Sequence, residues 1–418
     1  MEPNVFSPIW QQLERLGVRR GWADEFRPSP RLRRGPAIAD LVPGRPVDNE
    51  HGSFFLGERR YPLDHVHGRF PLRDLLDYGG AVAADLSGQA DWRGLDFRRA
   101  AFIDTETTGL AGGTGIYTFL VGVGFFSNEH FCLEQYFMRD HGEEPAMIAA
   151  LRERLAALDA VISFNGRAFD LPLLETRFVC NRLALPLVAA PHLDLLLPAR
   201  RLWRTRLDSC ALGSLETNVL GVRRTGEDVP GHVIPSLYFQ YLHDGDARSM
   251  GSVFYHNVVD VLSMVTLATV LGHHLTAPDA AGIHAVDRYS LGRLYETLGR
   301  ADEAAAAYRR ALADSLPPDV RRVARRRLSF LCKRQGWWDE ALTVWQAVVE
   351  EEETTVYAHV EMAKYYEHRA REFGVAVRYT RQALDRVTTS DWDRCQTLGE
   401  ELEHRLRRLE RKQAREPA

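Results

Sequence analysis

Three short segments that lie far apart in the chain carry four carboxylates and a histidine in a fixed order. The first, Asp104-Thr105-Glu106, ends an apolar run over residues 100–103. That run is typical of a buried strand, and the alternation of a strand places Asp104 and Glu106 on one face at its carboxyl end. The later segments supply the other members, Asp170, His256 and Asp260. The chain must therefore fold so that one strand end meets two distant segments.

Acids gathered in this way repel one another unless a counter-ion neutralises them. Oxygen-rich sites of high negative charge are the sites that Mg²⁺ and Mn²⁺ prefer. Two such ions held about 3.5–4 Å apart position a water molecule and stabilise the leaving oxygen of a phosphodiester. The acids thus predict two divalent cations, Mg²⁺ or Mn²⁺, as cofactors.

The composition narrows the class of protein. The 418 residues are 45% apolar and 26% charged, which is typical of globular protein and of two or three domains. A net charge of −4 argues against a simple non-specific nucleic-acid binder, but not against a local basic groove. No apolar run approaches the roughly 20 residues that span a bilayer, and the start lacks the features of a signal peptide. Five scattered cysteines without a C-x-x-C favour a reducing cytoplasm over a disulfide framework or a zinc site.

The order of expected elements indicates the fold. Residues 1–75 read as an N-terminal extension of uncertain order, with one candidate strand at 53–56. The segment that follows predicts three strands, helix, strand, helix, strand and further helices. The expected strands are 100–104, 117–126, 130–137, 159–164 and 191–195, and the expected helices are 143–158, 169–183 and 251–274. This is a ribonuclease-H-like α/β arrangement over 76–276, a mixed five-stranded sheet with helices on both faces.

The remainder of the chain is helical and periodic. Two copies of a pattern of small and large residues lie 37 residues apart, and a third copy is weaker. The pattern predicts tetratricopeptide repeats, an all-α domain over 283–412, with a generic helical bundle as the alternative. The positions that carry the pattern are Gly292, Tyr295, Ala304, Tyr308 and Ala311, then Ser329, Ala341, Trp345 and Val348, and finally Ala363, Ala376 and Ala383.

The motifs resemble those of the DEDD exonuclease superfamily, and most closely the ribonuclease-H-like exonucleases predicted in bacteria with carboxyl-terminal tetratricopeptide repeats. The resemblance covers roughly residues 100–385, and three motifs in order are far more specific than one D-x-E. The segments that carry it are FIDTETTGLAGGTG (102–115), ISFNGRAFDLPLLETR (162–177), HLDLLLPARRLW (192–203), VPGHVIPSLYFQYL (229–242) and HNVVDVLSM (256–264). It implies that Asp104 bridges both metals, that Glu106 binds one, that Asp170 reaches the second, and that Asp260 closes the site.

Each of these residues also has a simpler interpretation. Asp170 has the alternative role of a helix N-cap. Asp260 has the alternative of a solvated helix position, which its apolar flanks disfavour because a buried acid needs a partner. His256 lies four residues before Asp260, so it is expected on the same side as a general base or water-orienting residue. The histidine branch of the superfamily places one more residue between the two, which keeps a structural histidine open as the alternative.

A further set of residues is predicted to bind substrate. Asn165 resembles the asparagine before the second acid, and its alternative is a local backbone bond. Gly109 would let a nucleic-acid end approach the backbone, or would simply serve a hairpin. Arg200 and Arg201 precede Trp203, so the arginines could bind phosphates and the tryptophan could stack on a base. For Trp203 a position in the core is favoured. The predicted set is Thr107, Gly109, Asn165, Phe169, Arg200 and Arg201.

The sequence as a whole predicts a metal-dependent nuclease, most simply a 3′-to-5′ exonuclease acting on single-stranded nucleic acid or a 3′ end. The repeats are expected to bind a protein partner, and no membrane association is expected. Two alternatives stay open. One is a non-catalytic scaffold that grips nucleic acid and recruits a partner, and the other is a structure-specific endonuclease.

Overall fold

The computed structural model describes residues 35–94, 96–109, 114–351, 355–387 and 392–415, with the side chains of 392–396 left aside. The chain divides into two compact units. The first comprises Met1–Asp77, Leu95–Asp194 and Leu220–Thr266, and the second comprises Tyr78–Gly94, Leu195–Val219 and Leu267–Ala418. The three acidic segments all belong to the first unit.

A mixed sheet forms the centre of the first unit. Its strand order is β1-β2-β7-β6-β5-β8-β9. The strand β5 pairs antiparallel with β6 and parallel with β8, so the mixed character of the predicted sheet is confirmed. The five expected strands are present as β5 (Ala100–Thr107), β6 (Thr118–Phe126), β7 (His130–Phe137), β8 (Ala160–Ser163) and β9 (His192–Asp194).

The predicted number of five strands is wrong, because the sheet has seven. The two additional strands, β1 (Gly44–Asn49) and β2 (Gly52–Pro62), form an antiparallel hairpin, and β2 adds to the edge at β7. Gly52 makes the hairpin turn possible, since its φ of 128° suits glycine. The sequence signal covered only 53–56, where Phe54, Phe55 and Leu56 are buried, because the charged run Glu58-Arg59-Arg60 interrupts the apolar pattern of β2. A smaller hairpin, β3 (Val66–His67) with β4 (Phe70–Pro71), follows.

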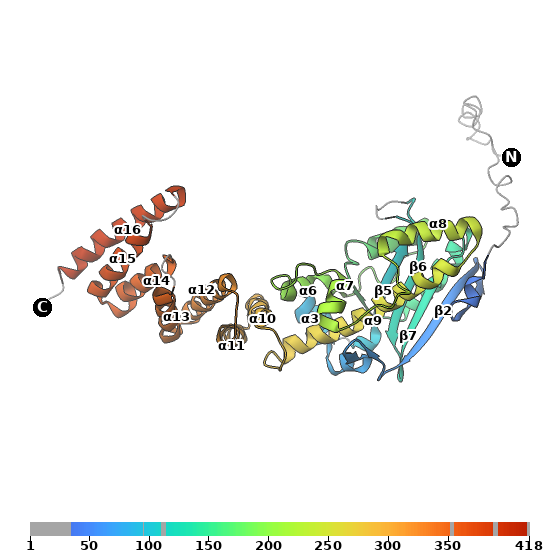
Figure 1. Ribbon diagram of the computed structural model, residues 1–418, viewed down its shortest axis with the longest axis horizontal. Helices are drawn as coiled ribbons and strands as arrows, with labels where there is room; N and C mark the ends of the chain where they lie inside the picture. The colour runs from blue at the N-terminus through green and yellow to red at the C-terminus, as the bar shows by residue number, and fades with distance from the viewer. Residues whose placement is uncertain (1–34, 95, 110–113, 352–354, 388–391, 416–418) are drawn as a thin grey trace, which may run out of the picture. The chain divides into compact units, whose positions relative to one another are not determined.

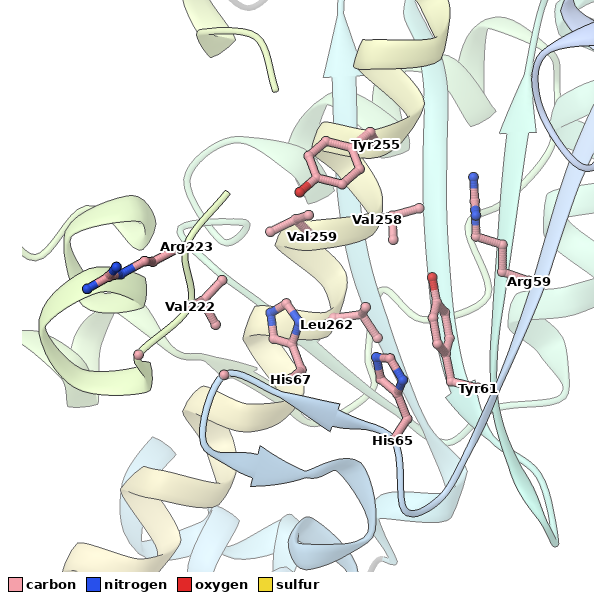
Figure 2. Close-up of a pocket in the computed structure, with 12 residues that line it drawn as sticks. Arg59, Tyr61, His65, His67, Val222, Arg223, Tyr255, Val258, Val259 and Leu262 are labelled. Carbon is pink, nitrogen blue, oxygen red and sulfur yellow. The ribbon is translucent and has the colours of Figure 1, made fainter. Parts of the chain in front are cut away.

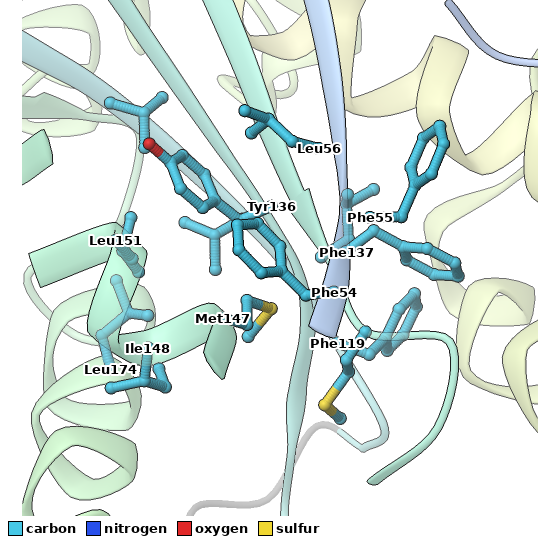
Figure 3. Packing of buried hydrophobic residues seen from close by; sticks show 14 of the residues in the cluster. Phe54, Phe55, Leu56, Phe119, Tyr136, Phe137, Met147, Ile148, Leu151 and Leu174 are labelled. Atoms are coloured by element: carbon cyan, nitrogen blue, oxygen red, sulfur yellow. The ribbon is translucent and has the colours of Figure 1, made fainter. Parts of the chain in front are cut away.

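Helices cover both faces of this sheet, as predicted. On one face, α4 (Glu144–Ala156) and α5 (Asp170–Cys180) pack Met147, Leu151 and Leu174 towards Phe54 and Tyr136 (Figure 3). The other face carries α8 (Ile234–Asp244) and α9 (Arg248–Thr276), which lie across the central strands in Figure 1. Two aromatic contacts mark the second face, Phe119 on Tyr238 with ring centroids 3.9 Å apart and Phe55 on Phe254 at 6.2 Å.

Helix α9 approaches the sheet unusually closely. A Cβ at Gly122 would lie 2.3 Å from Asn257 Oδ1, and a Cβ at Gly124 would lie 2.6 Å from Val261 Cγ1. Both glycines belong to β6, where a missing side chain often marks a close approach by another backbone. The two glycines therefore fix how near α9 comes to β5 and β6.

Helix α9 is long and apolar enough to cross a membrane by length and composition alone, although the sequence had suggested no such run. In the structure, 83% of its most apolar window is buried inside the protein. Among the described residues it is the one helix of this kind. Its apolar character is thus accounted for by packing in the core.

The second unit is helical. It includes α3 (Gly80–Ser87), α6 (Leu196–Trp203) and α7 (Leu212–Leu215) besides the C-terminal helices. Small residues let these C-terminal helices interlock: a Cβ on Gly292 would lie 2.5 Å from the ring of Tyr308. The C-terminal helices are α10 (Ala285–Thr297), α11 (Ala301–Ala313), α12 (Pro318–Gln335), α13 (Trp338–Glu351), α14 (Tyr357–Tyr365), η8 (Tyr366–Ala370), α15 (Phe373–Val387) and α16 (Trp392–Gln413). The prediction of a helical region after the sheet domain is confirmed.

Candidate active site

Asp104 and Glu106 lie at the end of β5 on the face that α9 covers. Asp104 pairs across the strands with Gly122 and Glu106 with Leu120, so alternation turns both carboxylates to the side of α9. Thr105 between them faces the opposite side. Both acids are only partly exposed. The first motif therefore presents two carboxylates, in the orientation that the sequence predicted.

Asp170 reaches the same strand end from α5. It is 8% exposed, and its carboxylate accepts a hydrogen bond from Thr105 Oγ1 at 2.5 Å. The helix begins at Asp170 and its N-cap position is Phe169, so the alternative of an N-cap aspartate does not describe this residue. Burial raises the pKa of Asp170 to about 6, although bonds from Thr105 and the backbone oppose the rise. Thr105 thus positions the third acid against the first motif.

Asp260 enters the cluster from α9 together with His256. The two side chains lie on one side of the helix, with His256 Nε2 3.7 Å from Asp260 Oδ2. A guanidinium that the sequence had not singled out, that of Arg224, donates to Asp260 Oδ1. Arg224 Nη1 also lies 3.1 Å from His256 Nδ1. The last acid is therefore held beside both a histidine and a cation.

A second unforeseen residue, Asp228, orients the imidazole. Its Oδ1 lies 2.8 Å from His256 Nδ1. The guanidinium of Arg224, which can only donate, lies 3.1 Å from the same nitrogen. The contact with Asp228 is the shorter of the two, and because a carboxylate can only accept, it favours a proton on Nδ1 and leaves Nε2 as the acceptor. The basic nitrogen of His256 is then the one that faces Asp260.

A buried amide chain fixes Asp104 from behind. Asn257 Nδ2 donates to Asp104 Oδ2 at 2.8 Å, and Gln135 Nε2 donates to Asn257 Oδ1 at 2.8 Å. Both amides are fully buried. Sequence reasoning missed them, although Gly122 gave a signal, since its missing side chain makes room for Asn257. Asn257 and Gln135 are positioning residues for the carboxylate of Asp104.

The electrostatics show that the four acids act on one another. Burial, with the charges of Asp260 and Asp170, raises the pKa of Asp104 well above its usual value. Burial, with the charges of Asp104, Asp260 and Asp170, raises the pKa of Glu106 in the same way. Arg224 lowers both pKa values, yet the net shifts remain upward. The positive charge that the chain supplies is therefore too small to offset the burial and mutual repulsion of these acids.

The chemistry of this donor set fits divalent cations, because its members are carboxylate oxygens in a half-buried, anionic place. Within the described residues, no three His, Cys, Asp or Glu side chains already converge as the ligands of one ion. Arg224 occupies the cationic position beside Asp260 instead. A bound cation would therefore compete with a guanidinium.

Four of the residues predicted to bind substrate lie in the segments that carry the first three acids. Thr107 is buried and its Oγ1 donates to the carbonyl oxygen of Gly109 at 2.8 Å, while residues 110–113 lie outside the described residues. Asn165 is exposed with a φ of 65°, and its backbone N–H donates to Asp194 Oδ1 at 2.8 Å. Phe169 is 37% exposed. These four residues flank Asp104, Glu106 and Asp170 along the chain.

Arg200 and Arg201 belong to the second unit, on α6. Arg201 Nη1 donates to the carbonyl oxygen of Leu86 at 3.2 Å. Trp203 is fully buried and packs edge-to-face on His274, so it is a core residue, as the simpler interpretation held. A stacking role for Trp203 is therefore excluded.

Two comparisons with known proteins place the chain. Residues 101–272 match the family model of the RNase_H superfamily. Over 360 residues the chain is 31% identical to an uncharacterized protein, YprB, of Bacillus subtilis (strain 168), and the match covers 85% of each chain. The chain belongs to the family of YprB and contains a domain of the RNase_H superfamily. This assignment confirms the ribonuclease-H-like part of the predicted fold and indicates nuclease-type chemistry in general.

Proposed function

We propose that the protein is a metal-dependent exonuclease that hydrolyses single-stranded nucleic acid from its 3′ end. The observation that carries the proposal is the convergence of four carboxylates from β5, α5 and α9, whose charges raise the pKa values of Asp104 and Glu106. In a structural cluster the cations of the chain would offset the repulsion between the acids, whereas here the pKa values stay raised despite Arg224. The superfamily assignment supports nucleic acid as the ligand class.

Asp104, Glu106, Asp170 and Asp260 would hold two divalent cations, Mg²⁺ or Mn²⁺. Bound there, the cations supply positive charge that activates water and stabilises the leaving oxygen of a phosphodiester. Thr105 and Asn257 keep two of the carboxylates in place, since each donates a hydrogen bond to one of them. Such supporting bonds are typical of metal ligands.

His256 would accept the proton of the attacking water at Nε2. The bond between Nδ1 and Asp228 orients the ring and favours the required tautomer. The same carboxylate stabilises the imidazolium once the proton has arrived. Thr107, Gly109, Asn165 and Phe169, which lie beside the acids along the chain, would position the terminal nucleotide. Arg200 and Arg201 would bind phosphates of the strand.

The test is digestion of 5′-labelled single-stranded DNA and RNA in Mn²⁺. We expect a ladder of progressively shorter labelled products, and none with Asp104→Ala. The exposed acid Glu50 gives a matched control, because Glu50→Ala removes a charge elsewhere in the same unit. Release of the label as a mononucleotide would show instead that digestion starts at the 5′ end. No cleavage of either strand, or cleavage unchanged by Asp104→Ala, would defeat the proposal.

Two rival functions are separated by further substrates. A circular single strand resists an exonuclease, since it has no end, whereas an endonuclease opens it. A non-catalytic scaffold would bind strands but leave them intact and would give a silent calorimetric titration with Mn²⁺. The uncompensated repulsion between the acids of the cluster favours the catalytic alternative.

We assign the C-terminal helices to tetratricopeptide repeats over residues 283–412, after a nuclease domain over 76–276 whose sheet is extended by β1 and β2. The packing of Gly292 against Tyr308 supports this assignment, because small and large residues interlock in such repeats. Stacked repeats offer an extended concave surface for a protein partner. Four cysteines whose side chains the structure describes form no disulfide, which agrees with a cytoplasmic location: Cys132, Cys180, Cys210 and Cys332.

A further inference from the structure

A cavity of about 410 Å³ lies in the first unit, apart from the four acids (Figure 2). Its volume falls in the range of roughly 300–1,000 Å³ that small-molecule sites occupy. Strand β2 and the β3–β4 hairpin form one side of it, and α9 with residues 221–223 forms the other. The N-terminal hairpins that the sequence left unassigned are therefore what creates this cavity.

The lining combines three kinds of surface. Val258, Val259 and Leu262 of α9 give an apolar floor. Tyr61 and His65 give a ring wall, with centroids 4.8 Å apart and planes inclined by 49°. An apolar floor beside aromatic rings is suited to the flat face of a base, because stacking needs no sequence-specific bond.

Arginines supply the charge of the cavity. Arg59 and Arg223 both line it, from opposite sides, and Figure 2 shows the side chain of Arg223 directed away from Tyr61. The Nε of Arg59 is buried and meets no hydrogen-bond acceptor. None of the twelve lining residues, all within the described part of the chain, is an aspartate or a glutamate. The cavity is thus suited to an anion, and guanidinium groups match phosphate in particular.

The histidine His67 does not add to this positive charge. Its Nε2 lies 2.9 Å from Ser263 Oγ. Burial, with smaller contributions from His65 and Arg224, lowers the pKa of His67 to about 4. The ring is therefore neutral near pH 7 and forms part of the uncharged wall.

The cavity and the acid cluster share α9 and the segment before α8. Tyr255 and Val259 line the cavity, whereas their neighbours His256 and Asp260 belong to the cluster. Consecutive helical residues point about 100° apart, so one face of α9 lines the cavity and the adjacent face carries the acid cluster. Tyr255 also accepts a hydrogen bond from the backbone N–H of Thr225 at 3.1 Å, next to Arg224 of the cluster. The cavity therefore lies next to the acid cluster along α9, where a strand that ends at the acids could reach it.

We propose that the cavity binds a nucleotide of the substrate strand, its base against Tyr61 and the apolar floor of α9 and its phosphate on Arg59, with a neighbouring phosphate of the strand on Arg223. This inference rests on the proposed nuclease function and adds a strand-binding subsite that the N-terminal hairpins contribute. Because the proposed contacts with the base are stacking and apolar contacts, the subsite is expected to take any base.

The test is binding of fluorescent single-stranded DNA and RNA to the full chain, measured by anisotropy in EDTA so that no turnover occurs. Arg59→Gln and Arg223→Gln should each weaken binding by about tenfold, as expected for a bond to a charged group. Each should also reduce the slope of log affinity against log salt by about 0.7, the value for one phosphate contact on a single strand. Tyr61→Leu should weaken binding by roughly 5- to 100-fold and keep the slope, since stacking releases no counter-ion.

The neighbouring arginine gives the matched control. Arg60 is exposed and alternates with Arg59 along β2, so it faces the opposite side of the sheet. Arg60→Gln should leave both affinity and slope at the wild-type values. Arg223 is exposed, so its variant should fold even if a substitution at the partly buried Arg59 does not.

The outcomes separate this inference from the nuclease proposal. Wild-type affinity and slope in both arginine variants would overturn it, as would a wild-type chain that binds no strand. Arginine-dependent binding without any cleavage in Mn²⁺ would defeat the nuclease proposal and leave the cavity as a nucleic-acid-binding site. Arginine-dependent binding of a fluorescent nucleoside monophosphate, with strand binding unaffected, would show a site for free nucleotides and would also overturn the inference.

Discussion

Buried carboxylates occur in both units of the molecule, and their surroundings differ. In the second unit the side chain of Glu367 is fully buried, and it lies 2.7 Å from Arg408 Nη2 and 2.9 Å from Lys412 Nζ, with Arg405 as a further partner. Burial raises the pKa of Glu367, but the bonds from Arg408 and Lys412 outweigh it, so the pKa lies below its usual value. In the first unit, burial and neighbouring acids raise the pKa values of Asp104 and Glu106 despite Arg224.

The difference separates a structural use of charge from a functional one. Around Glu367 the chain supplies the cations, and the cluster holds η8 and α16 together. Around Asp104 the chain supplies further acids, and in the proposed function cations from solution would supply the missing positive charge. A buried charge without compensation costs stability, so such a cluster persists where function requires it. Each prediction below tests this contrast.

The largest effect is expected at Asp104. Asp104→Asn should reduce nuclease activity by at least about 10³-fold, because bound metal ions contribute several kcal/mol to such reactions. The thermal midpoint without metal should hold or rise, since the substitution removes a mutually repelled charge. Activity assays and thermal melts on the same preparation check both halves. A variant that keeps its activity, or that unfolds on losing the carboxylate, would contradict the assignment.

The opposite result is expected at Glu367. Glu367→Gln should lower the free energy of unfolding by about 2–3 kcal/mol, because it leaves basic side chains without their buried partner, which water only partly replaces. Denaturant unfolding measures the loss. Activity per folded molecule should stay at the wild-type level. A stable but inactive variant would mean that the C-terminal helices take part in the chemistry.

A smaller effect is expected at Asn257, which holds Asp104. Asn257→Ala should weaken Mn²⁺ binding by roughly 10- to 100-fold, the usual range for a group that supports a metal ligand. Calorimetry measures the affinity. Asn181→Ala serves as the control, because that side chain bonds only to the carbonyl oxygen of Arg177 among the contacts described for it. Equal affinities in the two variants would remove Asn257 from the site.

The smallest effect is in the pH dependence of stability. Burial is the main reason why the pKa of Asp170 is raised to about 6. At a pH between the usual pKa of an aspartate and about 6, this carboxyl group therefore holds a proton more often in the folded chain than in the unfolded chain. Stability from this group is complete at acid pH and is lost as the pH rises through about 6. Between roughly pH 4 and pH 6, the free energy of unfolding of the metal-free wild type should fall by about 1–2 kcal/mol more than that of Asp170→Asn. Parallel stability curves for the two proteins would contradict the raised pKa.

Local patterns in the sequence were sufficient to locate much of this fold and site. Alternation and apolar periodicity predicted β5, α5 and α9, and hence the segments that carry Asp104, Asp170 and Asp260. The predicted sheet lacked β1 and β2, because the charged run Glu58-Arg59-Arg60 interrupts the apolar pattern of β2 beyond 53–56. Glu367 showed no signal either, since its cations lie some 40 residues further along the chain.

The supporting residues of the site could not be predicted because they depend on tertiary approach. Arg224 and Asp228 lie in a segment without periodicity and meet His256 and Asp260 only when that segment folds over α9. Asn257 becomes a partner of Asp104 because Gly122 lets the helix come close. Glycines within a predicted strand were the one usable signal for that contact.

The central claim, that the four acids form one cation site, is tested most directly by the thermal shift that Mn²⁺ produces. At about 100 times its dissociation constant, a ligand that binds only the folded state adds about 2.7 kcal/mol to stability. The wild type and Glu367→Gln should both show this stabilisation, whereas Asp104→Asn and Asp260→Asn should lose it. A wild type that Mn²⁺ leaves unchanged, or an Asp260→Asn variant stabilised as fully as the wild type, would contradict the claim.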